Sequence, residues 1–233
     1  MAHIIMFGTS KGGQSKSTSA ILAATAFGDA PFNKRVAVVD LDPQKSVVKL
    51  RQYDLRAYDD PEIPFTIYDY TLSDLETNIQ ELKENYDVII LDAAGKFDVN
   101  MPIKDQEIFK ILVYIDFLFV PFCAGNFNLD STIEFLKMAL AVQDYKKDTD
   151  VPLSIYGYVS MFRSRTLANQ RLKQDIKEIN NQTGVRFLDV ELKDLTIYRE
   201  ADTITSLYDT KAYEMNYINF LRWINQISNL LYL

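Results

Sequence analysis

Near the N-terminus, an apolar segment and a helical pattern are joined by the sequence Lys11-Gly12-Gly13-Gln14-Ser15-Lys16-Ser17-Thr18. The residues before it, Ala2 to Phe7, predict a buried strand, and apolar residues recur at helical spacing from Lys16 to Phe27. The loop therefore leads into the N-terminus of a helix. Unpaired backbone N–H groups and the helix dipole favour a bound phosphate at such a position.

The residue types in this loop suit a nucleotide. Two glycines allow positive φ and a close approach of the backbone to phosphate oxygens. Lys16 is placed to reach the β- and γ-phosphates, the Ser17 hydroxyl to bind Mg²⁺, and Thr18 to add a bond to the α-phosphate. We therefore predict that ATP and Mg²⁺ bind here, through Lys11, Gly12, Gly13, Gln14, Ser15, Lys16, Ser17 and Thr18.

The loop departs from the common P-loop pattern G-x-x-x-x-G-K-[ST], because Ser10 and Ser15 stand where that pattern has glycine. It also contains an additional lysine, Lys11, and so resembles the deviant Walker A motif K-G-G-x-G-K-[ST]-T of the ParA/MinD family of partition and positioning ATPases. The resemblance implies a homodimer with ATP sandwiched at the interface, in which Lys11 reaches the nucleotide of the other subunit. A serine fits most loop conformations if its φ is negative, and we expect nucleotide binding to be retained with Ser15.

Two further apolar segments, residues 35–40 and 86–92, end in aspartate, and the first continues as Leu41-Asp42-Pro43-Gln44. Both are predicted to be parallel strands, whose carboxyl ends face the ligand in open α/β sheets. The resemblance implies that Asp40 holds a Mg²⁺-bound water, that Asp42 orients or polarises the attacking water, and that Asp92 binds the metal through water. For either segment alone, capping at a strand end is the alternative. The order and separation of all three segments favour the ATPase interpretation.

The chain also departs from the family after Asp92, where Ala93-Ala94-Gly95 replaces the usual prolines. This departure and Ser15 leave open an ATP-binding scaffold with little hydrolysis.

Length and pattern predict one domain over residues 1–233, of the α/β class. With 48% hydrophobic residues, a chain of this length can bury a large core. Residues 65–68, 117–121 and 153–159 predict further strands, with an edge strand at 186–188, and residues 73–84 and 166–180 predict helices. We expect a doubly wound, mostly parallel sheet with helices on both faces, the P-loop NTPase type.

Cysteine content and hydropathy indicate the cellular compartment in which the protein is expected. Cys123 is the only cysteine, so no intrachain disulfide can form and a cytoplasmic protein is expected. No apolar run reaches the roughly 18 residues of a membrane span, and we expect no signal peptide or separate N-terminal DNA-binding segment.

The C-terminal residues 213–231 predict an amphipathic helix, whose apolar stripe is formed by Tyr217, Phe220, Leu221, Ile224, Ile227 and Leu231. Trp223 falls beside this stripe. Some MinD-like relatives end in a membrane-binding helix, but Arg222 is the only cation here, whereas interfacial helices carry many. We expect the helix to pack on the sheet.

The charge distribution does not decide whether the protein binds DNA. The net charge is −7, yet residues 163–199 contain eight basic and five acidic residues, a net charge of +3. Candidate DNA contacts are Arg163, Arg165, Arg171 and Arg199, and an ordinary solvated helix face is the alternative.

We therefore predict a cytoplasmic, ParA-like ATPase for plasmid or chromosome partition. Lys11, Lys16 and Asp42 are its candidate catalytic residues, and Ser17, Asp40 and Asp92 its metal-binding residues. The resemblance implies weak intrinsic hydrolysis, nonspecific DNA binding by the ATP dimer with nucleoid association, and a ParB-like activator or cargo adaptor. A positioning ATPase for a protein or membrane cargo is one alternative. A tyrosine kinase of P-loop architecture, suggested by the 14 tyrosines, is another.

Overall fold

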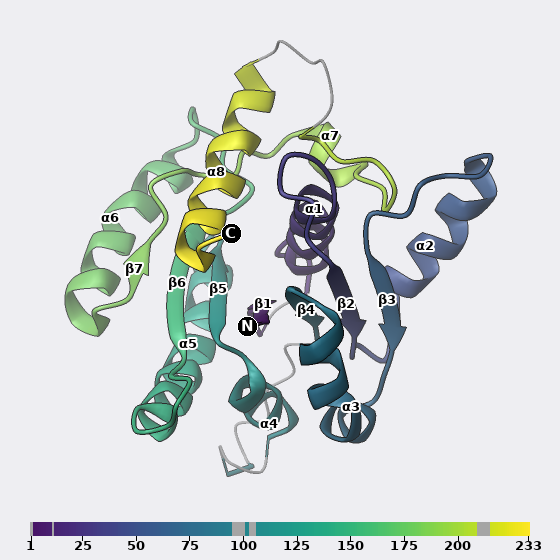
Figure 1. Cartoon of the computed structure of the whole chain (residues 1–233). Coiled ribbons are helices and arrows are strands. Elements are labelled where there is room, and N and C mark those ends of the chain that lie inside the picture. Colours follow the sequence, from purple (N-terminus) through teal and green to yellow (C-terminus); the bar gives the residue numbers. More distant parts are fainter. Residues whose placement is uncertain (1, 11, 95–100, 103–105, 209–214) are drawn as a thin grey trace.

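Seven parallel strands form one sheet in the order β3-β2-β4-β1-β5-β6-β7 (Figure 1). The computed structural model describes residues 2–10, 12–94, 101–102, 106–208 and 215–233. The strands are β1 (His3–Phe7), β2 (Val36–Asp40), β3 (Thr66–Asp69), β4 (Val88–Asp92), β5 (Phe117–Phe122), β6 (Ser154–Val159) and β7 (Arg186–Phe187). The predicted α/β fold with a mostly parallel sheet is confirmed, and every described strand pair is parallel.

Helices cover both faces of the sheet, as predicted. One face packs against α3 (Leu72–Asn85), α4 (Glu107–Tyr114), α5 (Asn126–Lys146) and α6 (Leu167–Thr183). The other packs against α1 (Lys16–Gly28), α2 (Ser46–Ala57), α7 (Thr196–Arg199) and α8 (Met215–Leu231). Alternate residues of β1 enter opposite clusters: Ile4 and Met6 face the first layer, Ile5 and Phe7 the second. Both faces of β1 are therefore buried in the core.

The strand sequences explain the parallel arrangement. All five residues of β2 and all five of β4 are buried, which is typical of strands covered by helices on both faces. The outermost strands, β3 and β7, contain half-buried and exposed residues. The edge strand predicted near residue 186 is confirmed, although it is only two residues long.

The central position of β1 determines where a ligand can enter. β4, β2 and β3 lie to one side of β1, whereas β5, β6 and β7 lie to the other (Figure 1). The strand order therefore reverses at the carboxyl end of β1, and open α/β sheets bind ligands at such a crevice. The register of the sheet also pairs Asp40 with Asp92, so the last residues of β2 and β4 lie side by side at this edge.

The C-terminal helix α8 packs on the sheet, as expected, and four of the six residues predicted for its apolar stripe are fully buried. Its fully buried residues are Phe220, Trp223, Ile224, Ile227 and Leu231. Tyr217 and Leu221 are only partly buried, so Trp223 belongs to the apolar stripe and its predicted place beside the stripe was wrong. Positions 220, 223, 224, 227 and 231 follow the helical period more closely. Among the described helices, none combines the length and the apolar character needed to cross a membrane.

Candidate functional site

The loop between β1 and α1 presents open backbone to solvent at its two glycines. A Cβ at Gly12 or Gly13 would meet no atom within 4 Å, and Gly13 has a φ of 75°. This positive φ is the conformation for which glycine was expected. The predicted nucleotide-binding residue Lys11 lies outside the described residues.

The second part of the loop is fastened to α5 through the side chain of Gln14. Its Oε1 atom accepts hydrogen bonds from Thr9 Oγ1 at 2.8 Å and Thr132 Oγ1 at 3.2 Å. The neighbouring Ser10 hydroxyl donates to the carbonyl of Ser131 at 2.7 Å. Gln14 therefore faces the protein interior, and a nucleotide in front of the loop could meet only its backbone.

Ser15 adopts a conformation that the sequence did not predict. Its φ of 58° and ψ of 22° place it in the left-handed region, so the negative φ with which a serine fits a loop easily is not found here. The backbone must turn there to enter α1, which begins at Lys16. For a residue with a Cβ, this conformation costs about 1–2 kcal/mol, which explains why the family motif has glycine at this position.

The first turn of α1 and the end of β4 meet at Asp92. Ser17 Oγ donates a 2.8 Å hydrogen bond to Asp92 Oδ2, and the carboxyl group is almost fully buried. Burial raises the pKa of Asp92 to about 7, and repulsion from Asp40 and Asp42 contributes to the rise. Burial also lowers the pKa of Lys16, while attraction to Asp92 and Asp42 opposes this shift. The predicted phosphate lysine and the predicted metal carboxylates therefore share one electrostatic site.

Asp40 has a structural partner that sequence spacing did not reveal. Its Oδ2 atom accepts hydrogen bonds from the backbone N–H groups of Val47 and Val48, at 3.1 and 3.2 Å, in the first turn of α2. Its Oδ1 atom accepts from the N–H group of Asp42 at 3.2 Å. Burial raises the pKa of Asp40, and these backbone bonds oppose the rise. Asp40 thus stabilises the start of α2, and its role toward a metal-bound water stays a prediction.

Lys45 is a residue of this site that sequence reasoning missed. Its Nζ atom donates to the carbonyls of Asp40 and Tyr70 at 2.8 and 2.9 Å and forms an ion pair with Asp69 at 2.6 Å. It therefore ties the loop after β2 to the end of β3. Asp42, in the same loop, accepts a 2.9 Å hydrogen bond from the backbone N–H group of Gln44. No local motif identifies Lys45, because its partners are mainly backbone carbonyls.

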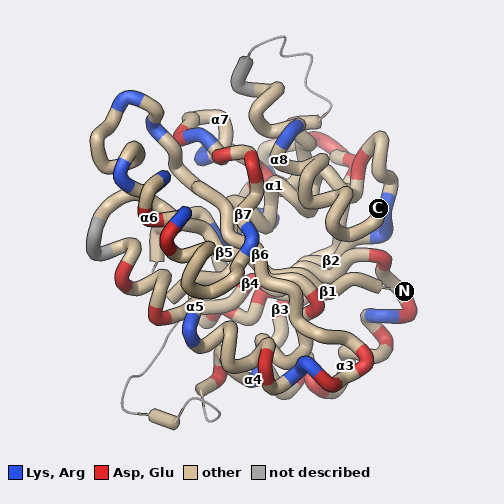
Figure 2. The backbone as a smooth tube through the Cα atoms, turned by 90° about the vertical axis from the view of Figure 1, so that its left-hand side faces the viewer, with Lys and Arg blue, Asp and Glu red and all other residues tan. Residues whose placement is uncertain are grey.

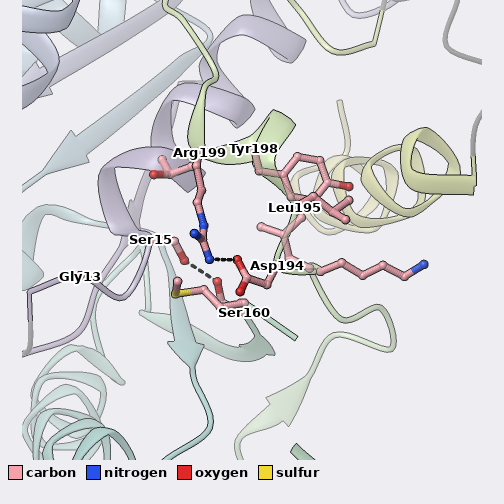
Figure 3. Close-up of a pocket in the computed structure, with 11 residues that line it drawn as sticks. Gly13, Ser15, Ser160, Asp194, Leu195, Tyr198 and Arg199 are labelled. Carbon is pink, nitrogen blue, oxygen red and sulfur yellow. Dashed lines mark hydrogen bonds and ion pairs between the residues drawn. The ribbon is translucent and has the colours of Figure 1, made fainter. Parts of the chain in front are cut away.

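A pocket of about 240 Å³ opens beside the loop (Figure 3). One wall consists of the loop and the first turn of α1, with Gly13, Ser15 and Thr18. The opposite wall consists of Ser160 and Met161, which follow β6, and of residues from 192 to 199. Because Leu192, Leu195 and Tyr198 supply apolar surface next to the phosphate loop, the pocket is suited to the base and ribose of a nucleotide.

Two of the four candidate DNA-binding arginines converge on one carboxylate at this pocket. Arg163 contacts Asp194 at 2.5 Å, and Arg199 forms a second ion pair with it, although the Asp194 side chain is only 5% exposed. Burial alone would raise the pKa of Asp194, but the two guanidinium groups hold it below its usual range. Both arginines are therefore engaged with this carboxylate.

The other two arginines lie in α6 and in the loop before it. Arg165 is exposed in the loop before α6, and Arg171 lines a second pocket of about 210 Å³ between α6 and the start of α5. Figure 2 shows basic residues along this loop and along α6, with acidic residues among them. Contact of these four residues with DNA stays a prediction.

Comparison with known proteins identifies the family. Residues 5–203 match the family model described as the CobQ/CobB/MinD/ParA nucleotide binding domain. The chain belongs to this family. The predicted relationship to ParA/MinD proteins is thereby confirmed, and it covers both the phosphate loop and the acidic ends of β2 and β4.

Solved structures from this group share the fold over nearly their full length. A plasmid partition protein from Borrelia burgdorferi is 19% identical, with a TM-score of 0.65 and coverage of 97% of this chain and 99% of that chain. The ATP complex of McdA from Cyanothece is 14% identical, with a TM-score of 0.69 and coverage of 97% and 96%. A cobyrinic acid a,c-diamide synthase from Mycobacterium smegmatis, with an ATP analogue and magnesium bound, is 14% identical, with a TM-score of 0.67 and coverage of 99% and 96%. No curated protein matches the chain.

Proposed function

We propose that residues 1–233 act as one ATPase domain that dimerises around two Mg-ATP molecules and binds nonspecific DNA in that state. A ParB-like activator or cargo adaptor would stimulate hydrolysis and release the dimer from the nucleoid. Partition proteins and a diamide synthase share this fold, so the fold alone does not distinguish between these functions. The function is therefore inferred from residues of this chain. The observation that carries it is the 2.8 Å bond between Ser17 and Asp92, which joins the phosphate loop to an acidic strand end.

The geometry supports a definite placement of the nucleotide. Phosphates would meet the N–H groups of the loop and of the first turn of α1, with Lys16 adding a positive charge. The base would enter the pocket between Thr18 and the segment 192–199, whose walls are largely apolar. Lys11 of the partner subunit would approach the same phosphates, as the family motif implies.

The donor set at the ends of β2 and β4 suits magnesium. Ser17, Asp40 and Asp92 offer only oxygen atoms, which a hard cation prefers, and Mg²⁺ usually combines one or two carboxylates with water and substrate phosphates. These three residues would hold the ion, with Asp40 and Asp92 acting through water. When bound, Mg²⁺ neutralises charge on the β- and γ-phosphates. Asp42 would orient the water that attacks the γ-phosphate, and Lys16 would stabilise the charge that develops there.

A nucleotide-binding scaffold with little hydrolysis is the second candidate, because Ser15 holds its Cβ in a left-handed turn beside the phosphate site. The ATPase and the scaffold would both bind ATP, and they differ in the rate of hydrolysis.

The test combines oligomeric state, DNA binding and phosphate release. With Mg²⁺ and a slowly hydrolysed ATP analogue, we expect a dimer that retains nonspecific DNA at low salt, whereas the ADP form should do neither. Lys16→Ala should weaken nucleotide binding about tenfold or more, because a charged hydrogen bond is lost. Lys110→Ala, an exposed lysine on α4, is the matched control. A dimer that ignores DNA would contradict the partition role, and DNA-bound dimers without phosphate release would favour the scaffold.

A further inference from the structure

Two residues of the nucleotide pocket adopt left-handed conformations although they are not glycine. The described part of the chain contains six of them: Ser15, Asn33, Lys45, Asp60, Met161 and Tyr232. Ser15 and Met161 line opposite walls of the same pocket, with φ values of 58° and 53°. Such conformations persist only where the surrounding structure holds them, and they concentrate at ligand-binding sites. A contact within this pocket is therefore expected to stabilise the left-handed conformations of Ser15 and Met161.

The contact between the two walls is a bond between two serine hydroxyls. Ser160, the residue before Met161, contacts Ser15 hydroxyl to hydroxyl (Figure 3). Because the Ser15 hydroxyl donates its own hydrogen to the Gln14 carbonyl at 2.7 Å, Ser160 is the donor to Ser15. Ser160 is fully buried, and its backbone N–H group donates to the carbonyl of Phe122 at 2.9 Å. The phosphate loop is thereby attached to a fixed point beside β5 and β6.

We propose that the serine pair, Ser15 and Ser160, positions the phosphate loop for the nucleotide; this inference rests on the proposed ATP-binding function. A glycine at position 15 would adopt the left-handed turn freely but could not form the bond. The serine is strained in this turn, and its hydroxyl holds the turn from the opposite wall of the pocket. The loop amides then point toward the phosphate site before a ligand arrives, which lowers the ordering cost of binding. Both serines are positioning residues, because they act through the loop backbone.

A double-mutant cycle tests the pair. Affinity for ATPγS with Mg²⁺ would be measured by calorimetry for Ser160→Ala, Ser15→Gly and the double variant. A lost hydrogen bond corresponds to a reduction of about two- to tenfold, which we expect for Ser160→Ala in the natural chain. In the Ser15→Gly background, where the bond is already absent, Ser160→Ala should have no further effect. Equal losses in both backgrounds, or no loss in either, would overturn the proposal.

Two further variants separate positioning from general stability. Ser15→Ala keeps the Cβ and the strained turn but lacks the hydroxyl, so it should bind ATPγS more weakly than Ser15→Gly, which relieves the strain. Ser154→Ala, at the opposite end of β6, is the matched control and should bind as the natural chain does. If Ser15→Ala and Ser15→Gly lose affinity equally, the hydroxyl does not hold the turn and the proposal fails.

Hydrogen exchange of the ligand-free protein gives a second measurement that is independent of nucleotide binding. Amides of residues 13–18 should exchange faster in Ser160→Ala than in the natural chain, while Ser154→Ala leaves them unchanged. If the natural chain does not bind Mg-ATPγS, the proposed function fails, and this exchange pattern still decides whether the serine pair holds the loop. Unchanged exchange in Ser160→Ala would overturn the inference.

Discussion

Ser17 and Asp92 meet across a 2.8 Å hydrogen bond that joins the first turn of α1 to the last residue of β4. Burial raises the pKa of the Asp92 carboxyl to about 7, with repulsion from Asp40 adding to the rise. A magnesium ion at this place would compensate for the charge of ionised Asp92. In the metal-free protein the charge of Asp92 instead destabilises the fold as pH rises.

We expect Asp92→Asn to stabilise the metal-free protein at about pH 8. The folded-state pKa, about 7, exceeds the unfolded value of about 4. The stabilisation from the bound proton is therefore fully present below about pH 4 and is lost as pH rises through about 7. Thermal unfolding in EDTA should show a midpoint that falls with pH in the natural chain and stays more level in the variant.

The control for this experiment is Asp87→Asn, at the residue that precedes the same strand. A hydrogen bond from Arg35 lowers the pKa of Asp87, so its stabilising effect has the opposite sign: it is present above the unfolded pKa and lost as pH falls through the folded value. Parallel pH curves for Asp92→Asn and the natural chain would show that Asp92 does not determine this dependence. The Asp92→Asn variant should also lose the Mg²⁺ dependence of nucleotide binding.

Asp194→Asn should strengthen DNA binding, if the proposed DNA contact is correct. In the natural chain the Asp194 carboxylate forms ion pairs with both Arg163 and Arg199. Its removal therefore frees two neighbouring guanidinium groups. Two added phosphate contacts would steepen the dependence of log K on log salt by about 2. Fluorescence anisotropy with a duplex of mixed sequence, at several salt concentrations, measures both quantities. Asp189→Asn serves as the control, because Asp189 bonds to Gln226 and, among the residues that the structure describes, to no arginine. An unchanged salt slope would exclude these arginines as phosphate contacts.

The sequence predicted the sheet better than it predicted the helix starts. β2 and β4 are apolar runs ending in aspartate, so their identity follows from a local pattern. In contrast, α2 and α5 had no predicted counterparts. The residue before α2 is Lys45, in a left-handed conformation without a side-chain cap, and the capping carboxylate belongs to Asp40. Helix caps are expected at the residue directly before the helix. A cap that lies six residues earlier in the chain is therefore missed when only the sequence next to the helix is considered.

The candidate site was predictable as a set of residues but not as a set of contacts. Motif and strand order together predict that Ser17 and Asp92 lie at the same edge of the sheet, where the structure has a 2.8 Å hydrogen bond between them, and the roles of these residues stay predictions. The conformation of Ser15 and the partners of Lys45 depend on segments that are distant in sequence, and no periodicity encodes them. The same applies to Asp194, whose two arginine partners come from the loop after β6 and from the end of α7.

Thr203→Val should destabilise the fold by about 1–3 kcal/mol, because the buried Nε–H group of Arg51 loses its partner and Asp54 Oδ2 keeps only the bond from the backbone N–H group of residue 203. The Thr203 hydroxyl donates to Asp54 at 2.7 Å and accepts from Arg51 Nε at 2.8 Å, and all three residues are buried. Valine keeps the shape of threonine without its hydroxyl. This network fastens the chain after α7 to α2, so the segment that lines the nucleotide pocket should exchange amide hydrogens faster as well.

Chemical denaturation measures this change, with Thr205→Val as its control. Thr205 is exposed, and its hydroxyl lies 3.2 Å from the Tyr58 hydroxyl, so its replacement should change stability by no more than about 0.5 kcal/mol. Equal effects of the two substitutions would show that the buried network does not stabilise this segment.

Trp223 offers a test of whether α8 stays on the sheet in the presence of lipid. It is the only tryptophan of the chain, it is fully buried, and its ring centroid lies 5.8 Å from those of Phe7 and Tyr158. Because the apolar face of α8 is already in the core, vesicles of anionic phospholipid should neither sediment the protein nor change its fluorescence, with ADP or with an ATP analogue. Brominated phospholipids should leave the emission unquenched, while unfolding in guanidinium should expose the indole and shift its emission to longer wavelength. Quenching by brominated lipid would place Trp223 in the bilayer and would favour a membrane-positioning ATPase over a partition protein.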